Sequence, residues 1–220
     1  MKIQWLGHSS FKLTESTDRS VVTDPYHADY GVPFPEVAAD AVTVSHAHRD
    51  HNASELVSGD PIVLNRVGSF ELNGIHIYSV MSYHDDKKGS VRGKNLVFKF
   101  RMDGVEICHL GDIGEELSPM LAELLGAINV LLIPVGGHYT IDAEAAKDFV
   151  DKLMPDVVIP MHYEERDKDI DLDSVEDFLK YFDDENIIEI EGDTVEFDRA
   201  DFDGENTKIY VLKRGNNGTK

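Results

Sequence analysis

The chain has 220 residues, 41% of them hydrophobic and 29% charged, a composition typical of globular proteins, and we expect a single domain over residues 1–220. Its formal net charge of −21 repels phosphate backbones, which argues against a nucleic-acid partner. The single cysteine excludes an internal disulfide, and the sequence shows neither a signal-peptide pattern nor an apolar run of membrane-spanning length, so we predict a cytoplasmic protein without membrane contact.

The first half of the chain is predicted to form β-strands. Short runs rich in valine, isoleucine and phenylalanine are separated by turn residues such as Asp103-Gly104. The predicted strands are Ile3–Leu6, Phe11–Thr14, Ser20–Thr23, Ala41–Val44, Ile62–Asn65, Ile75–Val80, Asn95–Arg101 and Val105–Leu110.

Helical periodicity appears in the second half. Apolar residues recur at helical spacing over Leu117–Leu125, Ala143–Leu153 and Leu172–Phe182. Two short buried strands, Val130–Ile133 and Val157–Ile159, are predicted between these helices. Strands that come first and then alternate with helices indicate an α/β protein with two packed sheets and helices outside them.

A cluster of metal-ligating side chains follows the strand that ends near Val44. The cluster reads His46-Ala47-His48-Arg49-Asp50-His51. On extended backbone, residues two apart project to the same side, so His46 and His48 can reach one point. If the chain then turns into a helix, Asp50 and His51 can face a second point nearby. Imidazole and carboxylate groups suit zinc and other first-row metals, and the motif therefore predicts a pair of divalent ions.

Three further ligand candidates, His84, Asp112 and His162, each come shortly after a predicted buried strand. Loops at strand ends are where a rigid scaffold presents chemistry. The alternative interpretation, that the histidines of the cluster are ordinary surface residues, is disfavoured because crowded imidazoles are unfavourable unless a metal or another partner uses their lone pairs.

These motifs, taken in order, resemble those of the metallo-β-lactamase superfamily, and most of all its small bacterial metal-dependent hydrolases akin to L-ascorbate-6-phosphate lactonase. The resemblance covers nearly the whole chain. It rests on Trp5–Phe11, Thr23–Tyr26, Ser45–His51, His84, Gly111–Gly114, Pro134–Gly137 and Ile159–Tyr163. It implies a four-layer αββα sandwich with two metals at one edge.

The resemblance also implies a ligand set of five histidines and two aspartates. The first ion would be held by His46, His48 and His84. The second would be held by Asp50, His51 and His162, with Asp112 bridging the two ions. Asp24 would support the ligand loop without touching a metal. Zinc is the expected ion, with manganese or iron as alternatives.

Substrate contacts are expected from residues around this centre. The candidates are His8, in a Gly-His-Ser-Ser turn, then His138 and Tyr139, and finally Tyr163, next to a ligand. For His8 and Tyr163, a structural role is the alternative. Related proteins often carry Gly-Asp-Asn-Phe-Thr where this chain has Gly136-Gly137-His138-Tyr139-Thr140, so the pocket is expected to differ from theirs.

The predicted function is hydrolysis of an ester, lactone or phosphoester in a small anionic metabolite. A metal-bridging hydroxide would attack, with Asp50 and Asp112 as the catalytic carboxylates. One alternative is a non-catalytic metal-dependent binder or sensor. Another is a diiron redox protein, disfavoured because such relatives carry glutamate where His48 stands and add a flavin domain. The acidic excess after position 164 is interpreted as solvated surface, and the oligomeric state stays open.

Overall fold

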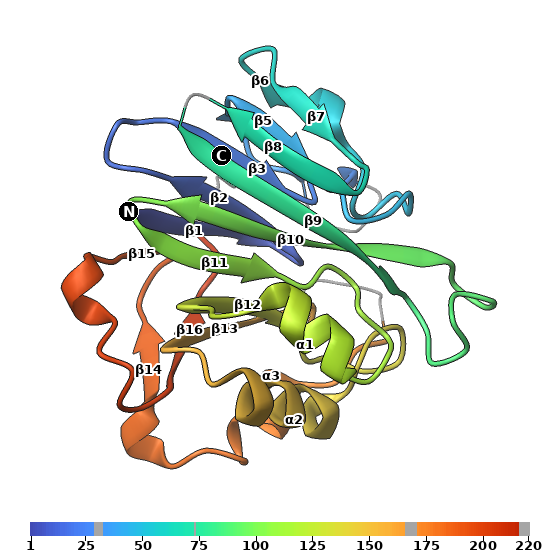
Figure 1. Cartoon of the computed structure of the whole chain (residues 1–220), viewed down its shortest axis with the longest axis vertical. Coiled ribbons are helices and arrows are strands. Elements are labelled where there is room, and N and C mark those ends of the chain that lie inside the picture. Colours follow the sequence, from blue (N-terminus) through green and yellow to red (C-terminus); the bar gives the residue numbers. More distant parts are fainter. Residues whose placement is uncertain (29–32, 73, 166–170, 216–220) are drawn as a thin grey trace.

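A computed structural model describes residues 1–28, 33–72, 74–165 and 171–215. Its first sheet has six strands in the order β15-β1-β2-β3-β5-β7 (Figure 1). These strands are β1 (Lys2–Gly7), β2 (Ser10–Thr14), β3 (Ser20–Thr23), β5 (Ala41–Thr43), β7 (Ile62–Leu64) and β15 (Thr194–Glu196). Asp167 and Asp169 of the acidic segment lie outside the described residues.

The second sheet has eight strands in the order β14-β16-β13-β12-β11-β10-β9-β8. They are β8 (Gly68–Leu72), β9 (Ile75–Tyr83), β10 (Lys94–Met102), β11 (Val105–His109), β12 (Val130–Pro134), β13 (Val157–Met161), β14 (Ile187–Ile190) and β16 (Lys208–Leu212). The strands from β11 through β13 to β16 and β14 pair in parallel, whereas β8 to β11 pair antiparallel.

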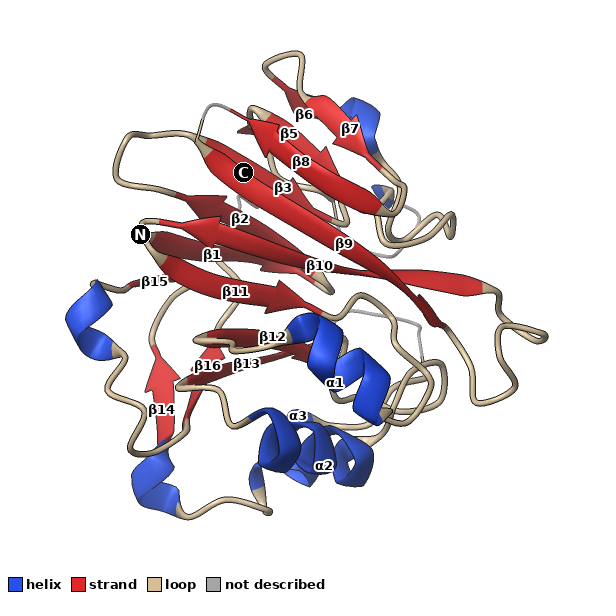
Figure 2. Ribbon diagram, viewed as in Figure 1, coloured by secondary structure: helices blue, strands red, loops and turns tan. Residues whose placement is uncertain are grey.

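The described residues contain three α-helices, which lie beside the eight-stranded sheet (Figure 2). They are α1 (Pro119–Leu125), α2 (Ala143–Leu153) and α3 (Val175–Leu179). Side chains Ser118 and Asp142 cap the first two by accepting a backbone N–H, as their positions before an apolar run favour. No helix in the described ranges has the length and apolar character needed to cross a membrane.

The mixed α/β fold class with two large sheets is confirmed. On the outer face of the six-stranded sheet, the described residues form short extended segments and a 3₁₀ turn. Within the described residues that face is covered by β4 (Val37–Ala38), β6 (Val57–Ser58) and a 3₁₀ turn at Ser54–Leu56. Pro33 and Pro35 shortly precede β4, and proline interrupts helical hydrogen bonding. Short extended pieces therefore take the place of a helical layer here.

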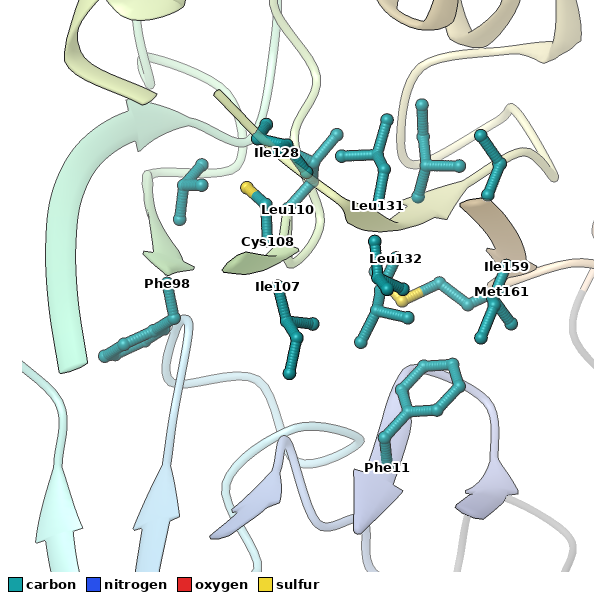
Figure 3. Close-up of a cluster of buried hydrophobic side chains, with 14 of the residues drawn as sticks. Phe11, Phe98, Ile107, Cys108, Leu110, Ile128, Leu131, Leu132, Ile159 and Met161 are labelled. Carbon is teal, nitrogen blue, oxygen red and sulfur yellow. The ribbon is translucent and has the colours of Figure 1, made fainter. Parts of the chain in front are cut away.

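Side chains of the six-stranded sheet pack in two hydrophobic cores, one on each face of the sheet, because successive residues of a strand point to opposite faces. Val21 belongs to the large core between the sheets and Val22 to a small outer core beneath β4 and β6. In the large core, Phe11 of one sheet faces Leu132 and Met161 of the other (Figure 3). A fully buried side chain of this size contributes about 1.5–3 kcal/mol, so the sheets are held firmly against each other.

All strands predicted from the sequence are present, with small shifts at their ends. The predicted helix over Leu172–Phe182 is shorter, spanning only Val175–Leu179. The edge strands β8, β14 and β15 were not predicted, because short strands that carry acidic residues or glycine lack a clear apolar pattern. The strand β16 and the two-residue strands β4 and β6 were not predicted either.

Candidate metal centre

The first half of the site is built at one end of the six-stranded sheet. Strands β1 and β3 both run antiparallel to β2, and β5 runs parallel to β3, so all three end at the same edge. His8 follows β1 directly, Asp24 follows β3 directly, and the segment from His46 to His51 follows β5. The directions of these strands therefore place the side chains that follow them at one edge of the sheet.

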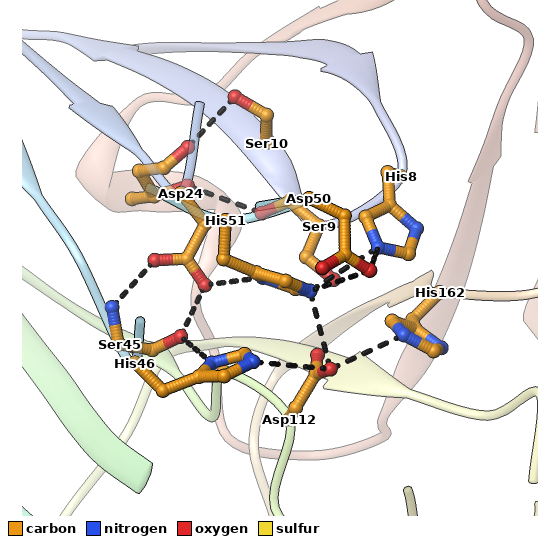
Figure 4. A network of polar contacts seen from close by, with 12 residues as sticks. His8, Ser9, Ser10, Asp24, Ser45, His46, Asp50, His51, Asp112 and His162 are labelled. Atoms are coloured by element: carbon orange, nitrogen blue, oxygen red, sulfur yellow. Dashed lines mark hydrogen bonds and ion pairs between the residues drawn. The ribbon is translucent and has the colours of Figure 1, made fainter. Parts of the chain in front are cut away.

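The second half comes from the eight-stranded sheet by the same principle. Strands β9 and β11 both run antiparallel to β10, and β13 follows β11 and β12 in parallel. His84 comes directly after β9, Asp112 after β11 and His162 directly after β13. Because the two sheets pack face to face, Asp112 and His162 meet residues of the first sheet (Figure 4), and the His84 ring lies 4.6 Å from that of His46 between centres.

Asp112 lies at the centre of the cluster and is almost fully buried. Its Oδ2 is 3.1 Å from His51 Nε2, 3.3 Å from His162 Nε2, 3.5 Å from His84 Nε2 and 3.8 Å from His46 Nε2. One carboxylate oxygen thus faces four imidazoles, from both sides of the site.

Two groups of side chains flank Asp112, and each could hold a metal ion. His46, His48 and His84 form one group, with ligand atoms within 4.8 Å of one another. The other group satisfies the same criterion and consists of His8, Asp50, His51 and His162. Both triads expected from the sequence are therefore brought together, and His8 joins the second.

Asp24 supports the site from behind, in the place expected for it. Its buried carboxylate accepts hydrogen bonds from the Ser45 backbone N–H (2.7 Å) and the Ser45 hydroxyl (2.5 Å). It also lies 2.9 Å from His51 Nδ1, which fixes that ring with Nε2 toward the cluster. The Ser45 oxygen in turn lies 2.9 Å from His46 Nδ1, so one aspartate orients rings of both groups.

Opposite charges dominate the electrostatics of the cluster. Burial would raise the pKa of Asp112, but His162 and His51 hold it well below its usual value. Burial would lower the pKa of His51, but Asp112, Asp24 and Asp50 raise it well above its usual value. Burial, together with His51, lowers the pKa of His46 to about 3, so this imidazole is neutral and its lone pair is available.

Two polar atoms of the cluster lack a partner within the protein and could bind a metal ion instead. Among the described residues, Asp112 Oδ1 and His46 Nε2 are buried without a hydrogen-bond partner. Leaving such atoms unpaired costs about 1–3 kcal/mol each, which a bound cation offsets. The donor set of imidazoles and carboxylates is the one zinc and similar ions take.

A pocket of about 210 Å³ opens onto the cluster. It is lined by His48, Asp50, His84, Arg92, Asp112, Tyr139 and His162. The Arg92 guanidinium lies 5.2 Å from the centre of the Tyr139 ring, so the two side chains form one wall. A larger hollow of about 460 Å³ lies around Met1, Lys2 and Glu196, and no histidine lines it.

The four candidate substrate contacts are placed differently. Tyr139 lines the pocket, and His138 lines a neighbouring hollow, where its ring lies 3.3 Å from Asp173. Tyr163 is buried in the core, with its ring centre 5.5 Å from that of Trp5, which is a packing position. His8 is buried beside the second metal group rather than on the pocket wall.

Sequence reasoning missed three residues that shape this site. Arg92 belongs to no motif in the sequence that would indicate a role in the site. Asn95 is fully buried on β10, and its side chain binds the Leu110 carbonyl (2.8 Å) and the Asp112 N–H (3.0 Å), which positions Asp112. Asp85 is buried and accepts four backbone N–H groups of residues 87–92, so it folds the loop that carries Arg92.

Known proteins resemble this chain in both sequence and fold. The Beta-lactamase superfamily domain matches residues 2–162. A UPF0173 metal-dependent hydrolase of Pyrococcus abyssi is 31% identical, over 74% of this chain and 84% of that protein. A solved structure from Thermotoga maritima, assigned as a Zn-dependent hydrolase of the metallo-β-lactamase superfamily, is 40% identical with a TM-score of 0.81, covering 97% of this chain and 98% of that one.

A more distant structure, isothiocyanate hydrolase from Delia radicum gut bacteria, is 16% identical with a TM-score of 0.69, over 90% of this chain and 99% of that one, and it shows the fold alone. The domain match covers most of the chain, and its residues include the ligand cluster, Asp112 and His162. This chain belongs to the metallo-β-lactamase superfamily, in which its similar relatives are described as metal-dependent hydrolases.

Proposed function

We propose that the protein is a dinuclear metal-dependent hydrolase that cleaves an ester, lactone or phosphoester bond in a small anionic metabolite. The observation that carries this proposal is the position of Asp112. Its Oδ2 lies 3.1–3.8 Å from the Nε2 atoms of four histidines, two from each metal group. A carboxylate between two imidazole groups is suited to bridge a pair of ions.

His46, His48 and His84 would hold one ion, and Asp50, His51 and His162 the other. When bound, two divalent ions polarise the scissile group and lower the pKa of water toward about 7, so hydrolysis needs no side-chain nucleophile. The preponderance of imidazole favours zinc, with manganese or iron as alternatives. Asp24 keeps His51 oriented, and Asn95 keeps Asp112 in place.

The anionic class of substrate is supported by Arg92. A guanidinium on the wall of a pocket this small offers paired N–H donors to a phosphate or carboxylate. The rest of the molecule is strongly acidic, with 42 acidic against 21 basic residues, so a cation at this position is a local exception. Tyr139 packs beside Arg92.

Two other functions are disfavoured by the same geometry. A pure binder or sensor needs no open pocket against both metal groups, yet this pocket is lined by His48 and His84 of one group and Asp50 and His162 of the other. A diiron redox role fits less well, because His48 supplies an imidazole where such relatives carry a carboxylate.

The proposal is tested by turnover of the metal-loaded protein on a panel of phosphodiesters, phosphomonoesters, lactones and thioesters, with metal content measured in parallel. We expect two ions per chain and turnover of at least one anionic class. Asp112→Asn, which keeps the shape of the side chain, is expected to lower metal affinity and activity by more than about 100-fold, exceeding the effect of losing an outer support. Two bound ions without turnover on any member would favour the sensor and overturn the proposal.

A further inference from the structure

We propose that His8 is a direct ligand of the second metal ion, which would then have five protein donors: His8, Asp50, His51, His162 and the bridging Asp112. This inference deepens the proposed function and rests on its two-metal centre. The resemblance of the sequence to its family did not assign His8 to a metal, and the evidence for this role comes from the position of its imidazole.

The His8 ring nitrogen has the spacing of a ligand atom. His8 Nε2 lies 3.2 Å from His51 Nε2 and 3.3 Å from Asp50 Oδ2. These separations equal those between atoms expected to share the ion, such as His51 Nε2 and Asp112 Oδ2 at 3.1 Å. Neighbouring ligands about 2.0–2.2 Å from one zinc ion, which proteins hold with four and sometimes five ligands, lie about 3–3.5 Å apart, so His8 fits the same ion.

A hydrogen bond explains this arrangement less completely than a shared ion. The Nδ1 side of His51 is already occupied by Asp24, so His51 presents only Nε2 to the cluster. His8 Nε2 can donate to Asp50 while His51 Nε2 donates to Asp112, but this pairing leaves two N–H donors, on His8 Nε2 and His51 Nε2, only 3.2 Å apart. One cation among His8 Nε2, His51 Nε2 and Asp50 Oδ2 serves all three at once.

The backbone fixes His8 in this place from both sheets. His8 has a φ of 54°, a left-handed conformation that is uncommon outside glycine, as has the ligand candidate His162 with 52°. The His8 N–H donates to Glu165 Oε1 (2.9 Å), and the His8 carbonyl accepts from Trp5 Nε1 (2.9 Å) and from the His162 N–H (3.3 Å). The two turns are thus tied together, and their rings lie 4.3 Å apart between centres.

A substrate contact, the role expected for His8 from the sequence, fits this position less well. The His8 side chain has no exposed surface, and His8 is not among the described residues that line the pocket. A side chain behind Asp50 and His162 reaches an ion between them, whereas a substrate in the pocket meets those two first. The second ion would therefore be held by more protein donors than the first and bind more tightly.

The test compares His8→Gln with His76→Gln, a matched control at an exposed position of β9. Zinc and cobalt(II) affinities are measured by competition with a chromophoric chelator, and stoichiometry by elemental analysis. We expect His8→Gln to weaken the tighter of the two sites at least about tenfold and leave the other unchanged. We also expect a changed cobalt(II) absorption spectrum, whereas His76→Gln should behave as wild type.

A measurement on the unaltered protein keeps the inference testable if His8→Gln does not fold. The exchangeable, paramagnetically shifted ring N–H signals of the cobalt(II) protein count coordinated imidazoles, and we expect six. Five signals, or a folded His8→Gln variant with wild-type affinities and spectrum, would overturn the role of His8 while leaving the two-metal centre intact. A wild-type protein that binds fewer than two ions would instead contradict the proposed function itself.

Discussion

Among the described residues that line the pocket, Arg92 is the only one with a fixed positive charge. It reaches this position because Asp85 accepts the backbone N–H groups of Lys87, Gly89, Val91 and Arg92 and so folds the loop between β9 and β10. Its guanidinium then stacks on Tyr139 at the mouth of the metal cluster. In the proposed function, recognition of the substrate by Arg92 is therefore separate from metal binding by the histidines and aspartates.

Substituting Arg92 by glutamine is expected to raise KM for anionic substrates about tenfold to 100-fold, with a smaller change in kcat. A hydrogen bond to a charged group contributes about 1.5–3 kcal/mol, which corresponds to this range. Arg92→Lys should give an intermediate value, since lysine keeps the charge and loses the paired geometry. Steady-state kinetics on an anionic and a neutral ester provide the measurement. Lys87→Gln, on the same loop and outside the pocket, is the control, and an equal loss on the neutral ester would contradict the role.

Cys108 shows how burial alone sets the chemistry of a residue. It is fully buried on β11, and this burial raises the pKa of its thiol to about 12, against about 8.5 for an unperturbed cysteine. The folded-state pKa exceeds the unfolded one, so the contribution of the thiol to stability is present below about pH 8.5 and is lost as the pH rises toward 12. The native protein should not react with a thiol-specific chromogenic reagent at pH 8, and the unfolded protein should release one equivalent. Rapid reaction of the native protein would contradict this burial.

At the residue scale, the sequence predicts ligands better than it predicts their supports. The spacing from His46 to His51 and the polar residues after buried strands identify side chains that the fold does bring together. Nothing in the sequence marks Arg92 or Asn95, because an isolated arginine or asparagine has many ordinary surface roles. Their functions depend on neighbours about 15 to 50 residues away, such as Asp112 and Tyr139.

At the scale of elements, the turns after strands carry the chemistry, and glycines let them approach one another. Gly136 follows β12 and packs against the turn that contains His162. A Cβ at this position would overlap the His162 carbonyl oxygen and lie 2.9 Å from Tyr163 Cα. Gly114 is placed similarly against the backbone of His84. Close packing of these turns fixes the positions of the ligands they carry.

Gly136→Ala is therefore expected to destabilise the protein by about 1–3 kcal/mol, as overpacking does, and to weaken metal binding by displacing His162. Gly192→Ala is the matched control, because a Cβ there meets nothing within 4 Å, and its effect should stay within about 0.5 kcal/mol. Chemical unfolding of the metal-free proteins and metal titration give the two quantities. Equal unfolding free energies and metal affinities in the two variants would show that close packing of the Gly136 and His162 turns is not required.

For the molecule as a whole, the net charge of −21 is the dominant electrostatic property. Like charges on a compact surface repel one another, and this repulsion destabilises the folded state. Salt screens it, since the Debye length falls from about 30 Å at 0.01 M to about 8 Å at 0.15 M. The acidic surface is thus expected to make stability depend on ionic strength.

We expect the Tm of the metal-free protein to rise by about 2–4 °C between 10 and 150 mM salt, which corresponds to about 1 kcal/mol for a chain of this size. Thermal unfolding followed by circular dichroism in the presence of a chelator measures this shift. Sodium chloride and choline chloride should act alike, because screening does not depend on the cation. A Tm that stays constant or falls would show that the acidic groups are already compensated within the fold.

Local patterns in the sequence were sufficient to predict ten of the sixteen strands in the described residues, two of the three helices there, the α/β class and the seven ligand candidates. These properties follow from periodicity and residue chemistry within short segments, so they are readable without knowing which segments meet. Only the tertiary structure decided that β1, β3 and β5 end at the same edge and that β9, β11 and β13 end opposite them. That arrangement placed His8 beside His51, Asn95 against Asp112 and Arg92 over the pocket. Such contacts depend on strand order, direction and register, which residues far apart in the chain set jointly when they bury a common core.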